Sequence, residues 1–201
     1  GATSFNQPIG DWNVSAVKHM NFMFHKASSF NQPIGNWETS SVTNMANMFN
    51  GASSFNQPIG GWDVSKVGTM GGMFHKASSF NQPIGDWNVS GATDFGSMFR
   101  NATRFNQPIG NWNTGNVKTI NRMFLEAKSF NQSIGNWDVS SIVDTHNAFN
   151  GKTALSNTNK GKIHAAFSVN KNWTYDWSEY ATQYSPLTDA NFKSAINLWF
   201  S

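Results

Sequence analysis

The chain has 201 residues and a formal net charge of +3, with 38% hydrophobic, 14% aromatic and only 12% charged residues. Because it lacks cysteine, it cannot form disulfides, thiolate metal sites or a cysteine nucleophile. Its basic residues are spread out rather than gathered in a run, which argues against a nucleic acid-binding surface. No segment has the length and hydrophobicity of a signal peptide or a transmembrane helix.

A 25-residue repeat occupies the first 150 residues and occurs six times without insertion or deletion. Positions are named here as columns, numbered by the first repeat, so that column 12 contains Trp12 and every residue 25, 50, 75, 100 or 125 positions later. Columns 5, 12 and 24 are Phe, Trp and Phe in all six repeats. A fixed period of this length is typical of a solenoid, in which each repeat forms one coil and packs on its neighbours. We therefore expect a six-repeat solenoid over residues 1–151.

Each coil is expected to contain one short strand and one helical turn. Trp12 and Val14 are two residues apart, which is the period of a strand, so a strand is predicted near 9–14. Val17, Met20 and Phe24 have helical spacing and predict a helical or 3₁₀ turn near 16–24, with Asn13 or Ser15 as its cap. Stacked coils of this kind would form a parallel β-sheet.

An asparagine occurs in column 6 of every repeat. Its side chain has both donors and an acceptor, so stacked copies can satisfy polar groups at a corner of the coil. We favour this structural ladder over a ligand-binding role. The six residues are Asn6, Asn31, Asn56, Asn81, Asn106 and Asn131.

Columns 11 and 13 flank the tryptophan column and are rich in carboxylates and amides. If Trp12 and Val14 point inward along a strand, these columns point outward and form a polar face. This face is the first candidate for ligand binding. Its residues are Asp11, Asn13, Asn36, Glu38, Asp63, Asp86, Asn88, Asn111, Asn113 and Asp138.

The sequence contains no pattern that indicates catalysis. The motifs HExxH, GxSxG and GxxxxGK[ST] are absent. His25 and His75 share a column but are two coils apart, ~10 Å at the spacing of strands, so they cannot bind one metal ion. The sequence disfavours a structural calcium site, because most coils offer at most one carboxylate and calcium needs about six to eight oxygens. We expect no enzyme activity, no metal and no cofactor.

Residues 152–201 depart from the repeat and predict a helical, aromatic-rich C-terminal cap. Leu155 and Ser156, and later Leu187 and Thr188, each resemble a hydrophobic staple followed by an N-cap, and therefore predict two helices. Such helices could cover the open end of a solenoid. The aromatic residues between them have an alternative role as a platform for a sugar ring. The candidates for that platform are Trp173, Tyr175 and Trp177.

The motif FNQPIGDWNVS, followed by MxxMFxxA, resembles the repeats of BspA-like leucine-rich-repeat surface proteins of bacteria. The resemblance covers residues 1–150. It implies a right-handed, leucine-rich-repeat-like solenoid in a secreted or cell-surface protein, and family members are often associated with adhesion. The repeat uses Phe, Trp and Met where leucine-rich repeats have Leu.

Taken together, these features predict an extracellular protein that mediates adhesion or recognition of a protein or glycan. Two alternatives stay open: a passive structural spacer within a larger surface protein, and a carbohydrate-binding module that uses the aromatic tail. Because the sequence begins inside a repeat, we expect any export signal or anchor to lie outside it. We expect no nucleic acid partner and no membrane insertion, and we regard end-to-end self-association of the open first coil as an option.

Overall fold

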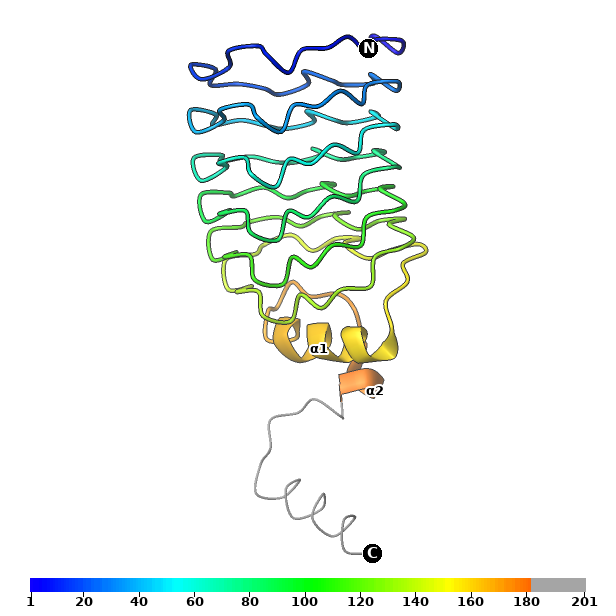
Figure 1. Ribbon diagram of the computed structural model, residues 1–201. Coiled ribbons are helices and arrows are strands. Elements are labelled where there is room, and N and C mark those ends of the chain that lie inside the picture. Colours follow the sequence, from blue (N-terminus) through cyan, green and yellow to red (C-terminus); the bar gives the residue numbers. More distant parts are fainter. Residues whose placement is uncertain (182–201) are drawn as a thin grey trace, which may run out of the picture.

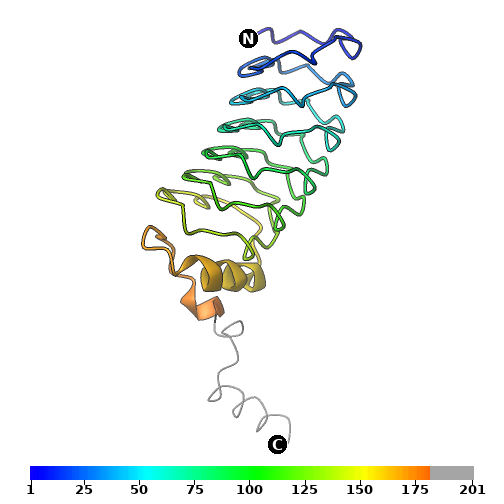
Figure 2. The ribbon, with the colours of Figure 1, turned by 90° about the vertical axis from the view of Figure 1, so that its left-hand side faces the viewer.

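The computed structural model describes residues 1–181, which fold into a stack of irregular coils followed by a short C-terminal segment (Figure 1). Two helices are present in this range, α1 (Asn157–Phe167) and α2 (Ser178–Ala181). The N-terminus lies at one end of the stack and α1 lies across the last coil at the other end (Figures 1 and 2). The second helix expected after Leu187 lies outside the described residues.

One hydrophobic core runs through the whole stack, because the same columns point inward in every coil. In each coil from the first to the fifth, the column 24 phenylalanine stacks on the phenylalanine six residues later, as Phe24 does on Phe30 at 3.9 Å between ring centroids. Phe49 then stacks on Phe74 of the next coil at 5.7 Å. The core continues into the C-terminal segment through Leu155, Ile163 and Phe167.

Tryptophan side chains join each coil to the one before it. The indole nitrogen of Trp37 donates a hydrogen bond to the carbonyl of Ile9, and the four later tryptophans of this column repeat the contact at 2.9–3.2 Å. Buried indole N–H groups need such a partner, because leaving one unsatisfied costs ~1–3 kcal/mol. The tryptophan side chains therefore stabilise the stack both by packing in the core and by hydrogen bonding to the preceding coil.

The prediction of a leucine-rich-repeat-like solenoid built from short parallel strands is wrong. Within residues 1–181 no strand forms, and the segment near 9–14 is a turn in which Trp12 N–H donates to the carbonyl of Ile9. Parallel pairing is limited to isolated single-residue bridges along column 19, such as His19 with Asn44. The two-residue spacing of Trp12 and Val14 belongs to this turn. Over so short a segment, a turn and a strand can have the same spacing of inward residues.

The helical or 3₁₀ turn predicted near 16–24 is also absent. Columns 22 and 26 have positive φ in every coil, including non-glycine residues such as Phe22 (59°) and Lys26 (59°). Two left-handed residues four positions apart in each coil end any helix before it can propagate. The freed backbone groups bond between coils instead: the N–H groups of Met20, Phe22 and Phe24 donate to carbonyls of the second coil at 2.9–3.0 Å.

The C-terminal segment differs from the expected α-helical cap. It has one helix of 11 residues, α1, and one of only four, α2, and the rest of 152–181 is turn and loop. The start of α1 was predicted correctly: Ser156 is the N-cap, and its side chain accepts a hydrogen bond from Asn159 N–H. Ile163 and Phe167 of α1 are buried, so this helix covers the core at the end of the stack.

Candidate functional site

All ten residues predicted to form the polar face in columns 11 and 13 are exposed; together they are called the outer row. Column 13 also has a local structural task, because its side chains accept a hydrogen bond from the backbone N–H two residues later. Asn13, Asp63 and Asp138 do so at 2.9–3.1 Å. Asn13 was expected to cap a helical turn, but no helix follows it, and this contact is a local turn that orients side chains still facing solvent.

Hydrogen bonding also favours the charged form of two outer-row carboxylates, Asp63 and Asp138. The side chain and backbone N–H of Ser65 lower the pKa of the Asp63 carboxyl, and Ser140 lowers that of Asp138 in the same way. Hydrogen bonds to an ionised carboxylate favour that form over the neutral acid. The outer row therefore presents negative charge and amide groups at neutral pH.

A shallow cavity of about 370 Å³ lies beside the outer row in the fourth to sixth coils. Asp86 and Asn111, both in the outer row, line it together with Pro83 and Pro108. The prolines restrict backbone motion at this corner. In this hollow, polar groups of the outer row lie next to rigid apolar rings.

The column 6 asparagines form a continuous row of hydrogen bonds. The side-chain oxygen of Asn6 accepts from the backbone N–H of Asn31 at 2.9 Å, and each later asparagine repeats this contact to the next coil, ending at Ser156. Glutamines such as Gln57 donate to the backbone carbonyl of the column 6 asparagine in the preceding coil at 2.8–3.1 Å. The row uses these amide groups between coils, and it continues into the N-cap of α1.

The aromatic residues proposed as a sugar platform pack against the end of the stack. Trp173, Tyr175 and Trp177 each contact the Phe149 ring, with centroids 5.4–6.1 Å apart, and all three are partly buried. The Tyr175 hydroxyl accepts from Phe149 N–H and donates to Asn150, both at 2.9 Å. Burial raises the pKa of that phenol. In the earlier coils, the N–H of the column 24 phenylalanine donates to a backbone carbonyl of the next coil. The last coil has no such neighbour, and the Tyr175 hydroxyl takes the place of that carbonyl.

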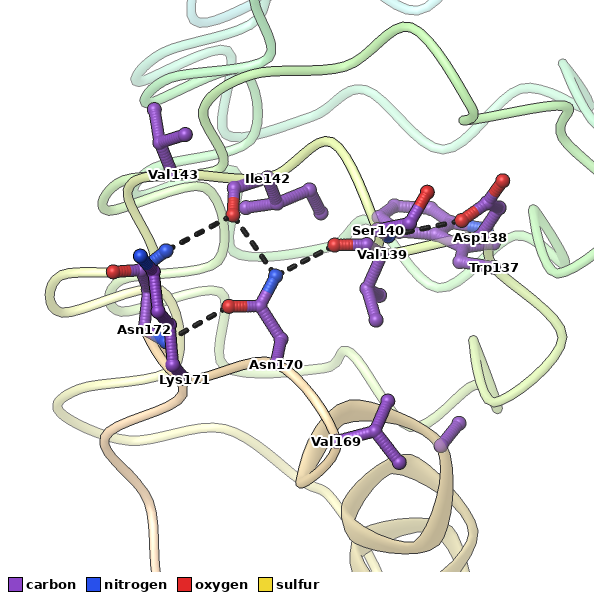
Figure 3. Close-up of a pocket in the computed structure, with 11 residues that line it drawn as sticks. Trp137, Asp138, Val139, Ser140, Ile142, Val143, Val169, Asn170, Lys171 and Asn172 are labelled. Atoms are coloured by element: carbon purple, nitrogen blue, oxygen red, sulfur yellow. Dashed lines mark hydrogen bonds between the residues drawn. The ribbon is translucent and has the colours of Figure 1, made fainter.

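A cavity of about 570 Å³ separates the last coil from the loop after α1 (Figure 3). The Asn170 carboxamide crosses it and donates to the carbonyls of Val139 and Ile142 at 2.6 and 2.9 Å. Its oxygen accepts from the backbone N–H of Asn172. Because these polar groups satisfy one another, the cavity is a joint between the coils and the C-terminal segment rather than an array of free ligand-binding groups.

A larger cavity, of about 690 Å³, crosses the middle coils, and sequence reasoning missed it. It is called the glycine groove: Gly71, Gly72 and Gly96 line it where columns 21 and 22 lack side chains, together with Asp94 and Arg100. The signal in the sequence was the occurrence of glycine in column 21 of the third and fourth coils, where the next coil has Asn121. None of the ten outer-row residues lines this groove.

His75, expected to be an ordinary surface histidine, lines the same groove and is partly buried. Burial, with Arg100 nearby, lowers its pKa from 6.5 to about 4, so its imidazole is neutral at pH 7. In residues 1–181 no three His, Cys, Asp or Glu side chains are grouped so that they could hold a metal ion. None of the helices in that range has the length and hydrophobicity to cross a membrane.

Comparison with known proteins gives a family. No curated protein and no solved structure matches the chain. Two overlapping segments, residues 1–79 and 57–162, match a family of repeat-containing proteins, and together they span the six repeats and most of α1. The chain therefore belongs to the family described as Mycoplasma protein of unknown function, DUF285.

Proposed function

We propose that this protein is an extracellular recognition module that binds a protein or glycan through its outward-facing columns. The observation that carries the proposal is the exposure of all ten outer-row residues, once or twice per coil, on one continuous hydrophobic core. The core and the asparagine row hold the backbone, and the outer row is left free to contact a partner. The resemblance of the repeats to BspA-like bacterial surface proteins supports the extracellular location and a role in adhesion.

Multiple weak contacts suit this surface better than one deep site. The outer-row side chains are short and polar, and the hollow at Asp86 and Asn111 is shallow. Contacts that repeat at the spacing of coils can act together, and their combined strength then exceeds that of any single contact. An extended glycan or a polypeptide with basic groups would match the negative charge of Glu38, Asp63 and Asp86.

The test is a screen of immobilised glycans and extracellular matrix proteins, followed by titration of each saturable hit. The variant is Glu38→Asn with Asp63→Asn and Asp86→Asn, because columns 11 and 13 carry Asn in other coils. We expect it to weaken binding at least tenfold and to leave the melting temperature unchanged. Binding unchanged in this variant contradicts the outer row as the contact surface, and a blank screen on folded protein contradicts recognition itself.

A spacer is the second candidate, and the continuous core favours it. The same aromatic stacking and the same asparagine contact join every pair of neighbouring coils, as a stiff rod requires. A spacer needs length and no ligand. The blank screen that contradicts recognition is the result expected for a spacer. A third outcome would point to the aromatic tail: a soluble sugar that binds the protein, and whose binding is lost in Trp177→Ala.

A further inference from the structure

The glycine groove lies where glycine occupies columns 21 and 22, which have no fixed residue in the repeat. Gly72 has a φ of +65°, and Asn47 and Ser97 in the same column have φ values of 56° and 57°, so this φ does not by itself require glycine. The space does, because a Cβ atom added to Gly72 would clash with Oδ1 of Asn47 in the preceding coil. Gly71 leaves room for Asp94 of the next coil in the same way, and Gly96 extends the glycine surface into that coil.

Polar oxygens occupy the space above these glycines. A Cβ atom added to Gly71 would lie 2.6 Å from Oδ2 of Asp94. Oδ1 of Asp94 accepts from Gly96 N–H at 2.7 Å, and Oδ2 accepts from Thr69 at 3.3 Å. Asp144 is held similarly by Asn121 at 3.0 Å. The groove thus has two oriented carboxylates, which have further lone pairs for a ligand's donors.

Arg100 and His75 contribute atoms whose hydrogen bonding is incomplete. Nε of Arg100 and Nε2 of His75 are buried and have no hydrogen-bond partner. Both atoms are closed off from solvent, so a ligand in the groove contacts these two residues through their other atoms. The observations that point to a ligand are therefore the cavity and the charged side chains that line it, Arg100 and Lys118 among them.

We propose that the glycine groove binds a carboxylated oligosaccharide, with the sugar carboxylate at Arg100 and sugar hydroxyls at Asp94 and Asp144. This rests on the proposed recognition function and names a ligand class and a second site for it. A guanidinium matches a carboxylate through paired hydrogen bonds, and Lys118 adds a second cation to the lining. Hydroxyl groups both donate and accept, so they can satisfy the aspartates and the nearby amides of Asn47 and Asn121.

The dimensions of the groove agree with this ligand class. Its volume of about 690 Å³ lies in the range of ~300–1,000 Å³ found for small-molecule sites. Asp94 and Asp144 are two coils apart, which is ~10 Å at the spacing of bridged chains, so a ligand that contacts both extends over more than one sugar ring. Glycines and polar side chains make up most of the lining residues, with Ala46 and Val143 as the apolar side chains among them.

The experiment is calorimetric titration with trigalacturonate and with 3′-sialyllactose, using methyl-esterified trigalacturonate as the uncharged match. We expect saturable binding of at least one acidic sugar and about tenfold weaker binding when its carboxylate is esterified. Arg100→Asn should weaken binding about tenfold, and Asn50 and Asn150 show that asparagine is accommodated in this column. Arg104→Ser is the control: it removes the same charge at an exposed position outside the groove where most other repeats have Ser, and it should change affinity less than twofold.

A second variant, Gly96→Asn, fills the groove with the side chain that the next coil has at Asn121. It should abolish binding while the melting temperature stays within a few degrees of that of the wild type. The proposal is overturned if neither acidic sugar binds, or if binding is unaffected in both Arg100→Asn and Gly96→Asn. In that case the broader recognition function still stands if the outer-row triple variant loses a ligand found in the screen, so the two failures are distinguishable.

Discussion

Two structural columns of this protein are identical in every repeat, whereas the outward columns vary from coil to coil. Column 12 is tryptophan and column 6 is asparagine in all six repeats, but the exposed column 13 contains Asn13, Glu38, Asp63, Asn88, Asn113 and Asp138. The difference follows from what each side chain contacts. An inward residue bonds or stacks with its neighbours in adjacent coils, so one change alters two contacts. An outward residue faces solvent and can change alone.

The largest expected effect comes from truncating an inward tryptophan. Trp62 is 3% exposed and its indole donates to the carbonyl of Ile34, whereas Trp12 in the first coil is 54% exposed. Trp62→Ala should lower the free energy of unfolding by about 3–5 kcal/mol through the cavity and the unpaired carbonyl. Trp12→Ala should cost less than about 1 kcal/mol. Urea denaturation of both variants checks this, and equal losses would contradict the account of the core.

The asparagine row should be the next most sensitive feature. In Asn56→Ala, the backbone N–H of Asn81 loses its acceptor, and we expect a loss of about 1–3 kcal/mol in the free energy of unfolding. Asn56→Asp keeps an acceptor oxygen in the same place and serves as the control. The account predicts that the aspartate variant retains more stability than the alanine variant in chemical denaturation. The reverse order would mean that the row acts through packing alone.

The Tyr175 hydroxyl should stabilise the last coil of the stack. Tyr175→Phe removes the acceptor of Phe149 N–H and the donor to Asn150, with an expected cost of about 1–2 kcal/mol. Hydrogen exchange at the Phe149 amide should accelerate, while that at Phe99, which bonds to the next coil, should be less affected. Similar acceleration at both amides would show that the C-terminal segment stabilises the whole stack and not only its end.

The smallest effect concerns His75 and pH. Its pKa is lowered from 6.5 to about 4 in the folded protein, so the unfolded chain takes up the proton more readily between these values. This histidine should therefore contribute full stability above pH 6.5 and lose it as the pH falls toward 4. Because it is only partly buried, we expect about 1–2 kcal/mol at most. His75→Asn should flatten the dependence of the urea midpoint on pH in this range, and an unchanged slope would contradict the assignment.

The repeat could be predicted from the sequence, but the fold class and the local backbone could not. The period, the inward aromatic columns and the N-cap at Ser156 were all accessible, because they depend on side-chain spacing and capping chemistry. The strand near 9–14 and the helical turn near 16–24 were wrong, because left-handed residues such as Phe22 and Lys26 have no sequence signal of their own. Their conformation is set by hydrogen bonds between coils, which a single repeat does not reveal.

The candidate sites divide in the same way. The exposure of the outer row could be predicted, because its columns flank the inward tryptophan column. The glycine groove could not be predicted in this way, because Gly71, Gly72 and Gly96 lie in variable columns that carry no consensus residue. The unpaired atoms of Arg100 and His75 became visible only once the coils were placed side by side.

The most direct test of the division between inward and outward columns is hydrogen exchange of the intact protein with and without a ligand from the binding screen. The account predicts that the ligand protects segments that contain outer-row or glycine-groove residues, around 86–100 above all, and leaves exchange in the asparagine row unchanged. Protection confined to residues 173–177 would contradict it, and would move recognition from the coils to the aromatic tail.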